Sequence, residues 1–317
     1  MMPAPSRMNR YETYKLVPYS VKRIRNQAYD PCIVLGVISS EVWFYESFVF
    51  NTLQLQLHKG HFVTCLKSFL GRAPAIVEPT DVDYQGLKNW LHKCRDDHTG
   101  TCRPQNINSV PSFKLIDCVS KKVIAASQSC EYVALSYVWG AVQGHVSGSC
   151  LPKRLPTTIK DAMTVTKELG YRFLWVDRYC IDQQNHTEKQ AQIHQMGYIY
   201  QGAALTIIAA AGSDPNYGLP GVSSRSRKAQ LQATVNGMAL ISVPTDPSSL
   251  IKDSNWMARA WTFQEGLFLA DVSISLKSLS TLNVRRPSST NRSSRWKISI
   301  HHRIHWIVLY SAWTYVM

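Results

Sequence analysis

The sequence predicts an open α/β fold with a parallel-sheet core, because three apolar segments alternate with two amphipathic segments over residues 132–211. The apolar segments 132–140, 172–177 and 204–211 have the length and near-continuous apolar character of strands that are buried on both faces. Each connection carries a helical pattern, so the strands should run parallel with right-handed crossovers. The predicted core is therefore a β-α-β-α-β unit with helical additions.

Two helices are predicted between these strands. The first begins at Thr157 or Thr158, either of which can serve as the N-cap, and ends at Gly170. The second begins near Thr187, which has Gln190 three residues later and therefore fits a capping box. Its apolar residues recur on one face through residue 200, so a single helix is expected.

Shorter patterns flank this core. Before it, a short amphipathic helix is predicted to begin near Tyr84, and alternation predicts a strand at 113–118. After it, we expect a small strand at 239–243, an aromatic helix over 256–269 and a poorly ordered segment from 271 to 298. The predicted domains are a poorly defined N-terminal region (1–83), the α/β domain (84–270) and a basic, Ser/Arg-rich tail (271–317).

The composition limits the classes of function. Hydrophobic residues make up 45% of the 317 residues, which is enough for a sizeable core. The formal net charge is +14, but the basic excess is concentrated towards both ends, which indicates solvated tails and no specific nucleic-acid groove. No apolar stretch reaches the ~20 residues of a membrane-spanning helix, and no signal peptide opens the chain. The eight cysteines form no CxxC pair, and because no secretory route is visible we expect reduced thiols, in the cytosol or the nucleus.

The carboxyl ends of the predicted parallel strands should form a ligand-facing edge. Ser136, Trp139 and Gly140 lie where the first strand ends, Asp177 ends the second, and Asp182 follows one helical turn later. Gly140 permits a positive φ or a close approach of the backbone to a ligand. The two acids would either face a ligand or cap the helix that follows, and the pattern leaves both readings open.

A Cys-x3-His-x3-Cys motif lies at Cys94, His98 and Cys102. With a fourth ligand, for which Cys118 is the candidate, it would hold zinc. However, this spacing is not that of a standard zinc motif, and no closed set of four ligands is visible. Because cysteine is often a small buried apolar residue, we expect no metal site here.

Three blocks of sequence carry a resemblance to a known family. They read Tyr-Val-Ala-Leu-Ser-Tyr-Val-Trp-Gly at 132–140, Leu-Trp-Val-Asp-Arg-Tyr-Cys-Ile-Asp-Gln at 174–183 and Arg-Ala-Trp-Thr-Phe-Gln-Glu at 259–265. In this order they resemble the signature blocks of the heterokaryon incompatibility (HET) domain of filamentous fungi. After Glu265 the chain departs from the family's usual Ser-Arg-Arg block, which raises the hypothesis of a truncated or mis-spliced coding sequence past Ala270.

The resemblance implies a cytoplasmic module of fungal nonself recognition, in which incompatible alleles trigger programmed cell death after hyphal fusion. Such a module would act through other proteins, with self-association as a further expectation. The resemblance also implies a fold distantly similar to Toll/interleukin-1 receptor (TIR) domains, whose sheets are flavodoxin-like. Because some TIR relatives cleave NAD, the alternative is a TIR-like NAD-hydrolysing enzyme.

In that alternative NAD is the substrate, and carboxylates beside the ribose would stabilise an oxocarbenium-like transition state. The catalytic candidates are Asp177, Glu265 and Asp182, and the candidates for binding NAD are Ser136, Trp139 and Gly140. Each has a structural alternative: the two aspartates as helix caps, Glu265 as an ion-pair partner of Arg259, and Trp139 as a core anchor. The sequence leaves the question of catalysis open.

Overall fold

The computed structural model describes residues 76–97, 104, 110–126, 130–140, 149–243, 250–251 and 253–259, together with the strands at 14–20, 33–39, 61–65, 272–276, 280–284 and 306–308. The chain divides into two units. Unit 1 comprises Met1–Ile76, Gln230–Asp246 and Tyr310–Met317, and unit 2 comprises Val77–Ala229 and Pro247–Leu309. The domain boundaries expected at residues 83 and 270 stay predictions.

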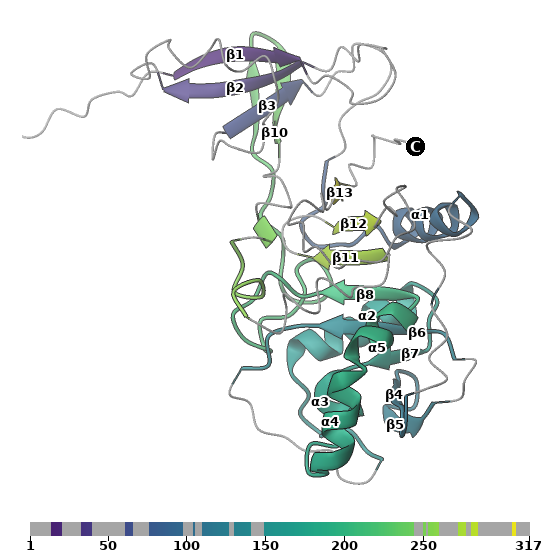
Figure 1. Ribbon diagram of the computed structural model, residues 1–317. Helices are drawn as coiled ribbons and strands as arrows, with labels where there is room; N and C mark the ends of the chain where they lie inside the picture. Colours follow the sequence, from purple (N-terminus) through teal and green to yellow (C-terminus); the bar gives the residue numbers. More distant parts are fainter. Residues whose placement is uncertain are drawn as a thin grey trace, which may run out of the picture. The chain divides into compact units, whose positions relative to one another are not determined.

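Unit 2 is built on a mixed eight-stranded sheet in the order β13-β12-β11-β8-β6-β7-β4-β5 (Figure 1). Its strands are β4 (Lys114–Asp117), β5 (Lys122–Ala125), β6 (Tyr132–Ser136), β7 (Phe173–Trp175), β8 (Leu205–Ile208), β11 (Val272–Leu276), β12 (Ser280–Val284) and β13 (Trp306–Val308). The four neighbours β11, β8, β6 and β7 run parallel, and antiparallel strands extend the sheet on both sides. The α/β class is confirmed, with a sheet that is parallel only in its centre.

Five helices of unit 2 are described: α1 (Tyr84–Asp97), α2 (Thr157–Glu168), α3 (Asp177–Cys180), α4 (His186–His194) and α5 (Met196–Gly202). The helix α2 connects β6 to β7, and α3 to α5 connect β7 to β8. This is the β-α-β-α-β order that the sequence predicts. Among the described residues, no helix is both long and apolar enough to cross a membrane.

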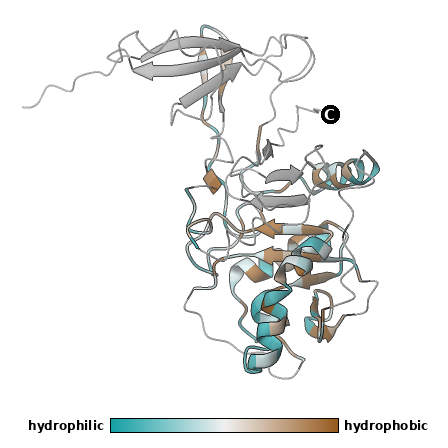
Figure 2. Ribbon diagram, viewed as in Figure 1, coloured by the Kyte–Doolittle hydropathy of each residue, from teal (hydrophilic) through white to brown (hydrophobic). Residues whose placement is uncertain are grey.

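The central strands are buried because nearly all of their residues are apolar. Every residue of β6 and β8 is buried, which is the burial expected of strands covered on both faces. Figure 2 shows apolar residues concentrated on these strands, whereas α4 is hydrophilic. On one face of the sheet, Tyr132 donates a hydrogen bond to the carbonyl of Ile199 in α5. On the same face, the rings of Trp175 and Tyr200 meet edge to face, with their centroids 5.3 Å apart.

The predicted caps of α2 are wrong. Its N-cap is Pro156, so Thr157 and Thr158 lie inside the first turn. The Thr158 hydroxyl instead accepts a hydrogen bond of 3.1 Å from the Gly218 amide, which holds the loop after β8 against this helix. The predicted end is confirmed, because Gly170 has a φ of 90° directly after the C-cap.

The second predicted helix is two helices, and its cap also differs from the prediction. The N-cap of α4 is Asn185, whose side-chain oxygen accepts a hydrogen bond from the Glu188 amide, so Thr187 is not the cap. The break falls at Gln195, whose φ of −100° and ψ of 7° leave the helical region. Asn-x-x-Glu and Thr-x-x-Gln are both cap patterns, and the earlier one begins the helix.

Two expectations for the later part of the chain are corrected. Residues 253–259 form turns, whereas the sequence predicts the start of an aromatic helix at Trp256. The rest of that predicted helix lies outside the described residues. The segment expected to be poorly ordered contains β11 and β12, because Val-Ser-Ile-Ser-Leu at 272–276 alternates like a strand and pairs in parallel with β8.

Unit 1 contains a five-stranded sheet in the order β1-β2-β3-β10-β9, in which every neighbouring pair is antiparallel. Its strands are β1 (Tyr14–Ser20), β2 (Ile33–Ser39), β3 (His61–Cys65), β9 (Gln232–Val235) and β10 (Met238–Val243). The small strand predicted at 239–243 is confirmed as most of β10. The other four strands of this sheet are not predicted from the sequence.

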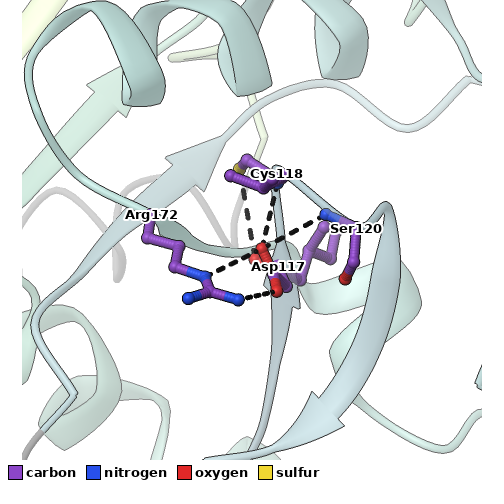
Figure 3. Close-up of polar contacts among 6 residues, drawn as sticks. Asp117, Cys118, Ser120 and Arg172 are labelled. Atoms are coloured by element: carbon purple, nitrogen blue, oxygen red, sulfur yellow. Dashed lines mark hydrogen bonds and ion pairs between the residues drawn. The ribbon is translucent and has the colours of Figure 1, made fainter.

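The turn between β4 and β5 is held by the buried carboxylate of Asp117 (Figure 3). This carboxylate accepts two hydrogen bonds from the Arg172 guanidinium, from Nη2 at 2.7 Å and from Nε at 3.2 Å. It also accepts bonds from the amides of Val119 at 3.0 Å and Ser120 at 3.4 Å. The Arg172 guanidinium holds the pKa of Asp117 well below its ordinary value, and the two backbone amides act in the same direction. Asp117 therefore fixes the antiparallel side of the sheet beside β7.

Candidate functional site

The candidate site is the edge of the sheet where the parallel strands β6, β7 and β8 end. The amide of Ala209, directly after β8, donates a hydrogen bond of 2.9 Å to the carbonyl of Ser136 at the end of β6. Asp177 begins the single turn of α3 two residues after β7 ends. In open α/β sheets this is the edge at which ligands bind.

The centre of this edge is a contact between two of the predicted residues. The indole Nε1 of Trp139 donates a hydrogen bond of 2.7 Å to Oδ2 of Asp177. The other carboxylate oxygen accepts a bond of 2.7 Å from the Arg178 amide, and Asp177 is only 9% exposed. The Arg178 guanidinium in turn lies 5.7 Å from the centre of the Trp139 ring, within cation–π range. The carboxylate and the indole therefore form one unit with a cation above the ring.

A second contact ties Ser136 to the turn at 253–259. The indole Nε1 of Trp256 donates a hydrogen bond of 2.7 Å to the Ser136 hydroxyl, and both residues are at most 2% exposed. In the same turn, Arg259 donates a bond of 3.1 Å to the carbonyl of Tyr137. Residues from the first and third sequence blocks thus meet at the end of β6.

Gly140 adopts the positive φ that the sequence predicts for it, at 62°. A Cβ at this position would lie 2.6 Å from Cδ of Pro215, so the close approach is to the loop after β8. The glycine is needed both for its φ and for this contact between two loops of the edge. A role of Gly140 in binding a ligand stays a prediction.

Tyr137 is a residue of this edge that sequence reasoning missed. It is 3% exposed, and its hydroxyl has no hydrogen-bond partner among the described residues. Burial raises the pKa of Tyr137, and the negative charge of Asp177 raises it further. The hydroxyl therefore stays protonated and is an unused donor close to the candidate carboxylate. Its position inside an apolar strand block gives no sign of this in the sequence.

Asp182 does not join the cluster around Asp177. Its Oδ1 accepts hydrogen bonds from the amides of Gln184 at 3.0 Å and Asn185 at 3.3 Å, as in an Asx turn. These backbone bonds lower the pKa of Asp182. Its observed contacts are those of a turn residue that precedes α4. The third catalytic candidate, Glu265, lies outside the described residues.

The zinc candidates are only partly described. Cys94 is buried on α1, while His98 and Cys102 lie outside the described residues. Cys118 is also buried, and burial raises the pKa of its thiol to about 12, which disfavours the thiolate that a metal needs. In the part of the chain that the structure describes, no group of three His, Cys, Asp or Glu side chains could hold a metal ion.

The three blocks of sequence agree with a comparison against protein families. Residues 132–265 match the family model described as "Heterokaryon incompatibility protein (HET)". The match spans residues 132–265 of the 317 residues, so this stretch of the chain is similar to the HET family. Among curated proteins the chain is similar to heterokaryon incompatibility protein 6, OR allele, of Neurospora crassa, with 32% identity over 93 residues. That match covers 24% of this chain and only 14% of the relative's length. No solved structure matches the chain.

Proposed function

We propose that this chain is a signalling module of fungal nonself recognition that leads to programmed cell death and acts by binding other proteins in the cytoplasm. The observation that carries the proposal is the HET family match over residues 132–265, which contains every described residue of the candidate edge. The similarity to a heterokaryon incompatibility protein of Neurospora crassa supports it.

The geometry of the edge favours binding over catalysis. Both carboxylate oxygens of Asp177 accept hydrogen bonds from its own chain, and the Ser136 hydroxyl accepts one from Trp256. A catalytic carboxylate must offer an oxygen to its substrate, and the two bonds together with the 9% exposure of Asp177 leave little of its carboxylate open to one. Asp177, Trp139 and Ser136 therefore serve best as the framework of a recognition surface.

A forced heterokaryon tests the proposal. One strain of a filamentous fungus expresses the chain and the fusion partner lacks it, and dead hyphal compartments are counted with a vital dye. We expect death after fusion with the unsubstituted chain. Asp177→Asn, which weakens the bond to Trp139, should lower the fraction of dead compartments, while Asp182→Asn, which changes a carboxylate in a turn, should not. Normal growth of heterokaryons with verified expression would refute the proposal.

The second candidate function is NAD hydrolysis on a flavodoxin-like or TIR-like sheet. One observation favours it: the parallel strands lie in the order β7-β6-β8-β11, which in chain order is 2-1-3-4. This is the strand order of flavodoxin-like sheets, whose ligands bind at the switch point between strands 1 and 3, here β6 and β8. In this alternative, Asp177 would orient the ribose hydroxyls and Trp139 would line the binding site.

Incubation of the purified chain with NAD separates the two candidates. Nicotinamide is measured by chromatography, and the main proposal expects no release above the protein-free blank. Release that Asp177→Asn abolishes and Asp182→Asn preserves would favour the enzyme. Glu265→Gln extends the test to the third candidate carboxylate.

A further inference from the structure

The hairpin of β9 and β10 exposes a stripe of large apolar side chains in unit 1. Leu231 is 70% exposed, Val235 is 42% exposed and Met238 is 51% exposed. Leu231 and Val235 are four residues apart on an extended segment, so their side chains point to the same face of the sheet. Val235 lies directly opposite Met238 in the antiparallel register, which places Met238 on that face as well.

Among the described strands, β9 also has an open backbone edge. The sheet order puts β9 last, next to β10 only, among the strands that the structure describes. The two-residue turn at Asn236 and Gly237 has φ values of 49° and 74°, as in a type I′ hairpin, so Val235 and Met238 form a hydrogen-bonded pair. Because hydrogen-bonding direction alternates along a strand, Gln232 and Thr234 direct their amides and carbonyls away from β10.

This edge lacks the features that usually prevent strands of two molecules from pairing. Edge strands are normally protected by charged residues, especially Lys, by Pro or by a bulge. The segment 230–243 contains no charged residue and no Pro, in a chain whose formal charge is +14. Two copies of the chain can therefore approach along β9 without bringing like charges of this hairpin together, whereas a charged partner would find no complementary group on it.

We propose that β9 pairs antiparallel with β9 of a second copy of this chain, joining the two five-stranded sheets of unit 1 into one. With the two-fold axis at Ala233, Gln232 lies opposite Thr234 of the partner subunit and Thr234 lies opposite the partner subunit's Gln232. These two pairs use all the outward amides and carbonyls and form four backbone hydrogen bonds. On the apolar face, Leu231 then lies beside Val235 of the partner subunit, and the reciprocal contact covers the stripe on both sides. The sequence of β9 is thus self-complementary in both its backbone and its apolar face.

This inference goes beyond the proposed function, because the hairpin belongs to unit 1 and the candidate edge belongs to unit 2. A contact of one strand pair is small, so the dimer should be weak and should depend on protein concentration. Sedimentation velocity from about 1 µM to about 200 µM spans the range expected for such an interface. The weight-average mass of the unsubstituted chain should rise towards that of a dimer over this range.

Two variants test the pairing by different routes. Thr234→Pro removes an outward amide that no β10 group uses, and Val235→Lys places a charged side chain beside Leu231 of the partner subunit in the apolar stripe. Each should weaken association at least about tenfold. The matched control is Val119→Lys, an equally drastic change at a 68% exposed side chain in unit 2, which should associate like the unsubstituted chain. Circular dichroism and thermal unfolding establish that each variant is folded, and Val235→Lys, at an exposed position, carries the test where Thr234→Pro does not fold.

A disulfide test reports the register. Ala233 faces its own counterpart across a non-hydrogen-bonded position, where Cα atoms lie about 4.5 Å apart and a disulfide can form. In a Cys150→Ser background, which removes an exposed thiol, Ala233→Cys should form covalent dimers under mild oxidation faster than Gln232→Cys. A chain that stays monomeric over the whole concentration range overturns the proposal. So does association that both hairpin variants leave unchanged, or cross-linking of the two cysteine variants at equal rates.

Discussion

Replacement of Asp117 by Asn should destabilise unit 2 through the loss of one buried carboxylate. Asp117 is 3% exposed and accepts four hydrogen bonds, two from backbone amides and two from Arg172. The Arg172 side chain is 61% exposed, so water and salt screen its contribution. The amide bonds to the buried carboxylate should account for most of the loss, about 1–2 kcal/mol. That corresponds to a fall in the melting temperature of about 2–8 °C.

The effect of Asp117→Asn should depend on pH, because the pKa of Asp117 is lowered in the folded state. Stabilisation from a group of this kind is fully present above its unfolded-state pKa of about 3.9 and is lost as the pH falls through the folded-state pKa. The difference in unfolding free energy between Asp117→Asn and the unsubstituted chain should therefore stay constant from about pH 5 to pH 8 and shrink below about pH 4.

Urea unfolding followed by circular dichroism measures both effects. The matched control is Glu131→Gln, which removes another Arg–carboxylate pair. Glu131 lies 3.6 Å from Arg95, and its side chain is 60% exposed. It should change the free energy of unfolding by no more than about 0.5 kcal/mol. Equal stability of Asp117→Asn and the unsubstituted chain at pH 7 would refute the reasoning, as would a difference that persists unchanged below pH 3.

Three further predictions concern residues of the candidate edge and the cap of α4. Trp256→Phe removes the indole donor to β6 and should lower the free energy of unfolding by about 1–2 kcal/mol, as measured by urea unfolding. Gly140→Ala should lower stability more than Gly170→Ala. Both glycines have a positive φ, but only at position 140 would the added Cβ clash with a neighbouring residue, and thermal unfolding of the two variants checks this. Asn185→Ala should cost about 1 kcal/mol through loss of the α4 cap, whereas Thr187→Ala should change stability by less than about 0.5 kcal/mol in the same urea assay.

The centre of the fold could be predicted because its signals are local. Strands covered on both faces are apolar along nearly their whole length. The short segments β6 and β8 have this character, and every one of their residues is buried. The helices between them carry their own periodicity, and the rule of parallel crossovers then gives the strand direction. The positive φ of Gly170 follows from the same kind of local evidence, since glycine after a helix is the usual residue for that conformation.

Other elements were missed where a local pattern was ambiguous or was outweighed by composition. Asn236-Gly237 is a strong hairpin signal, yet β9 reads Gln-Ala-Thr-Val, with a single large apolar residue, and it is not predicted from the sequence. In β11, alternation of Ser with apolar residues is a strand pattern, but the Ser/Arg-rich composition around it favoured disorder. The cap of α4 was ambiguous because Asn185 and Thr187 each begin a valid cap motif two residues apart.

The contacts of the candidate edge could not be predicted, because they join residues that are distant in sequence. Trp139 and Asp177 are 38 residues apart, and Ser136 and Trp256 are 120 residues apart. Spacing alone placed Asp177 at the end of a strand and left two roles for it, a ligand contact or a helix cap. The contacts add a third role, because its oxygens bind an indole and the amide of the next residue. This makes Asp177 the residue that holds Trp139 in place, so its replacement tests the shape of the edge as well as its chemistry. A variant that loses this hydrogen bond but keeps the carboxylate is therefore needed to separate the two, and Trp139→Phe supplies it, because it leaves both an aromatic ring and the Asp177 carboxylate.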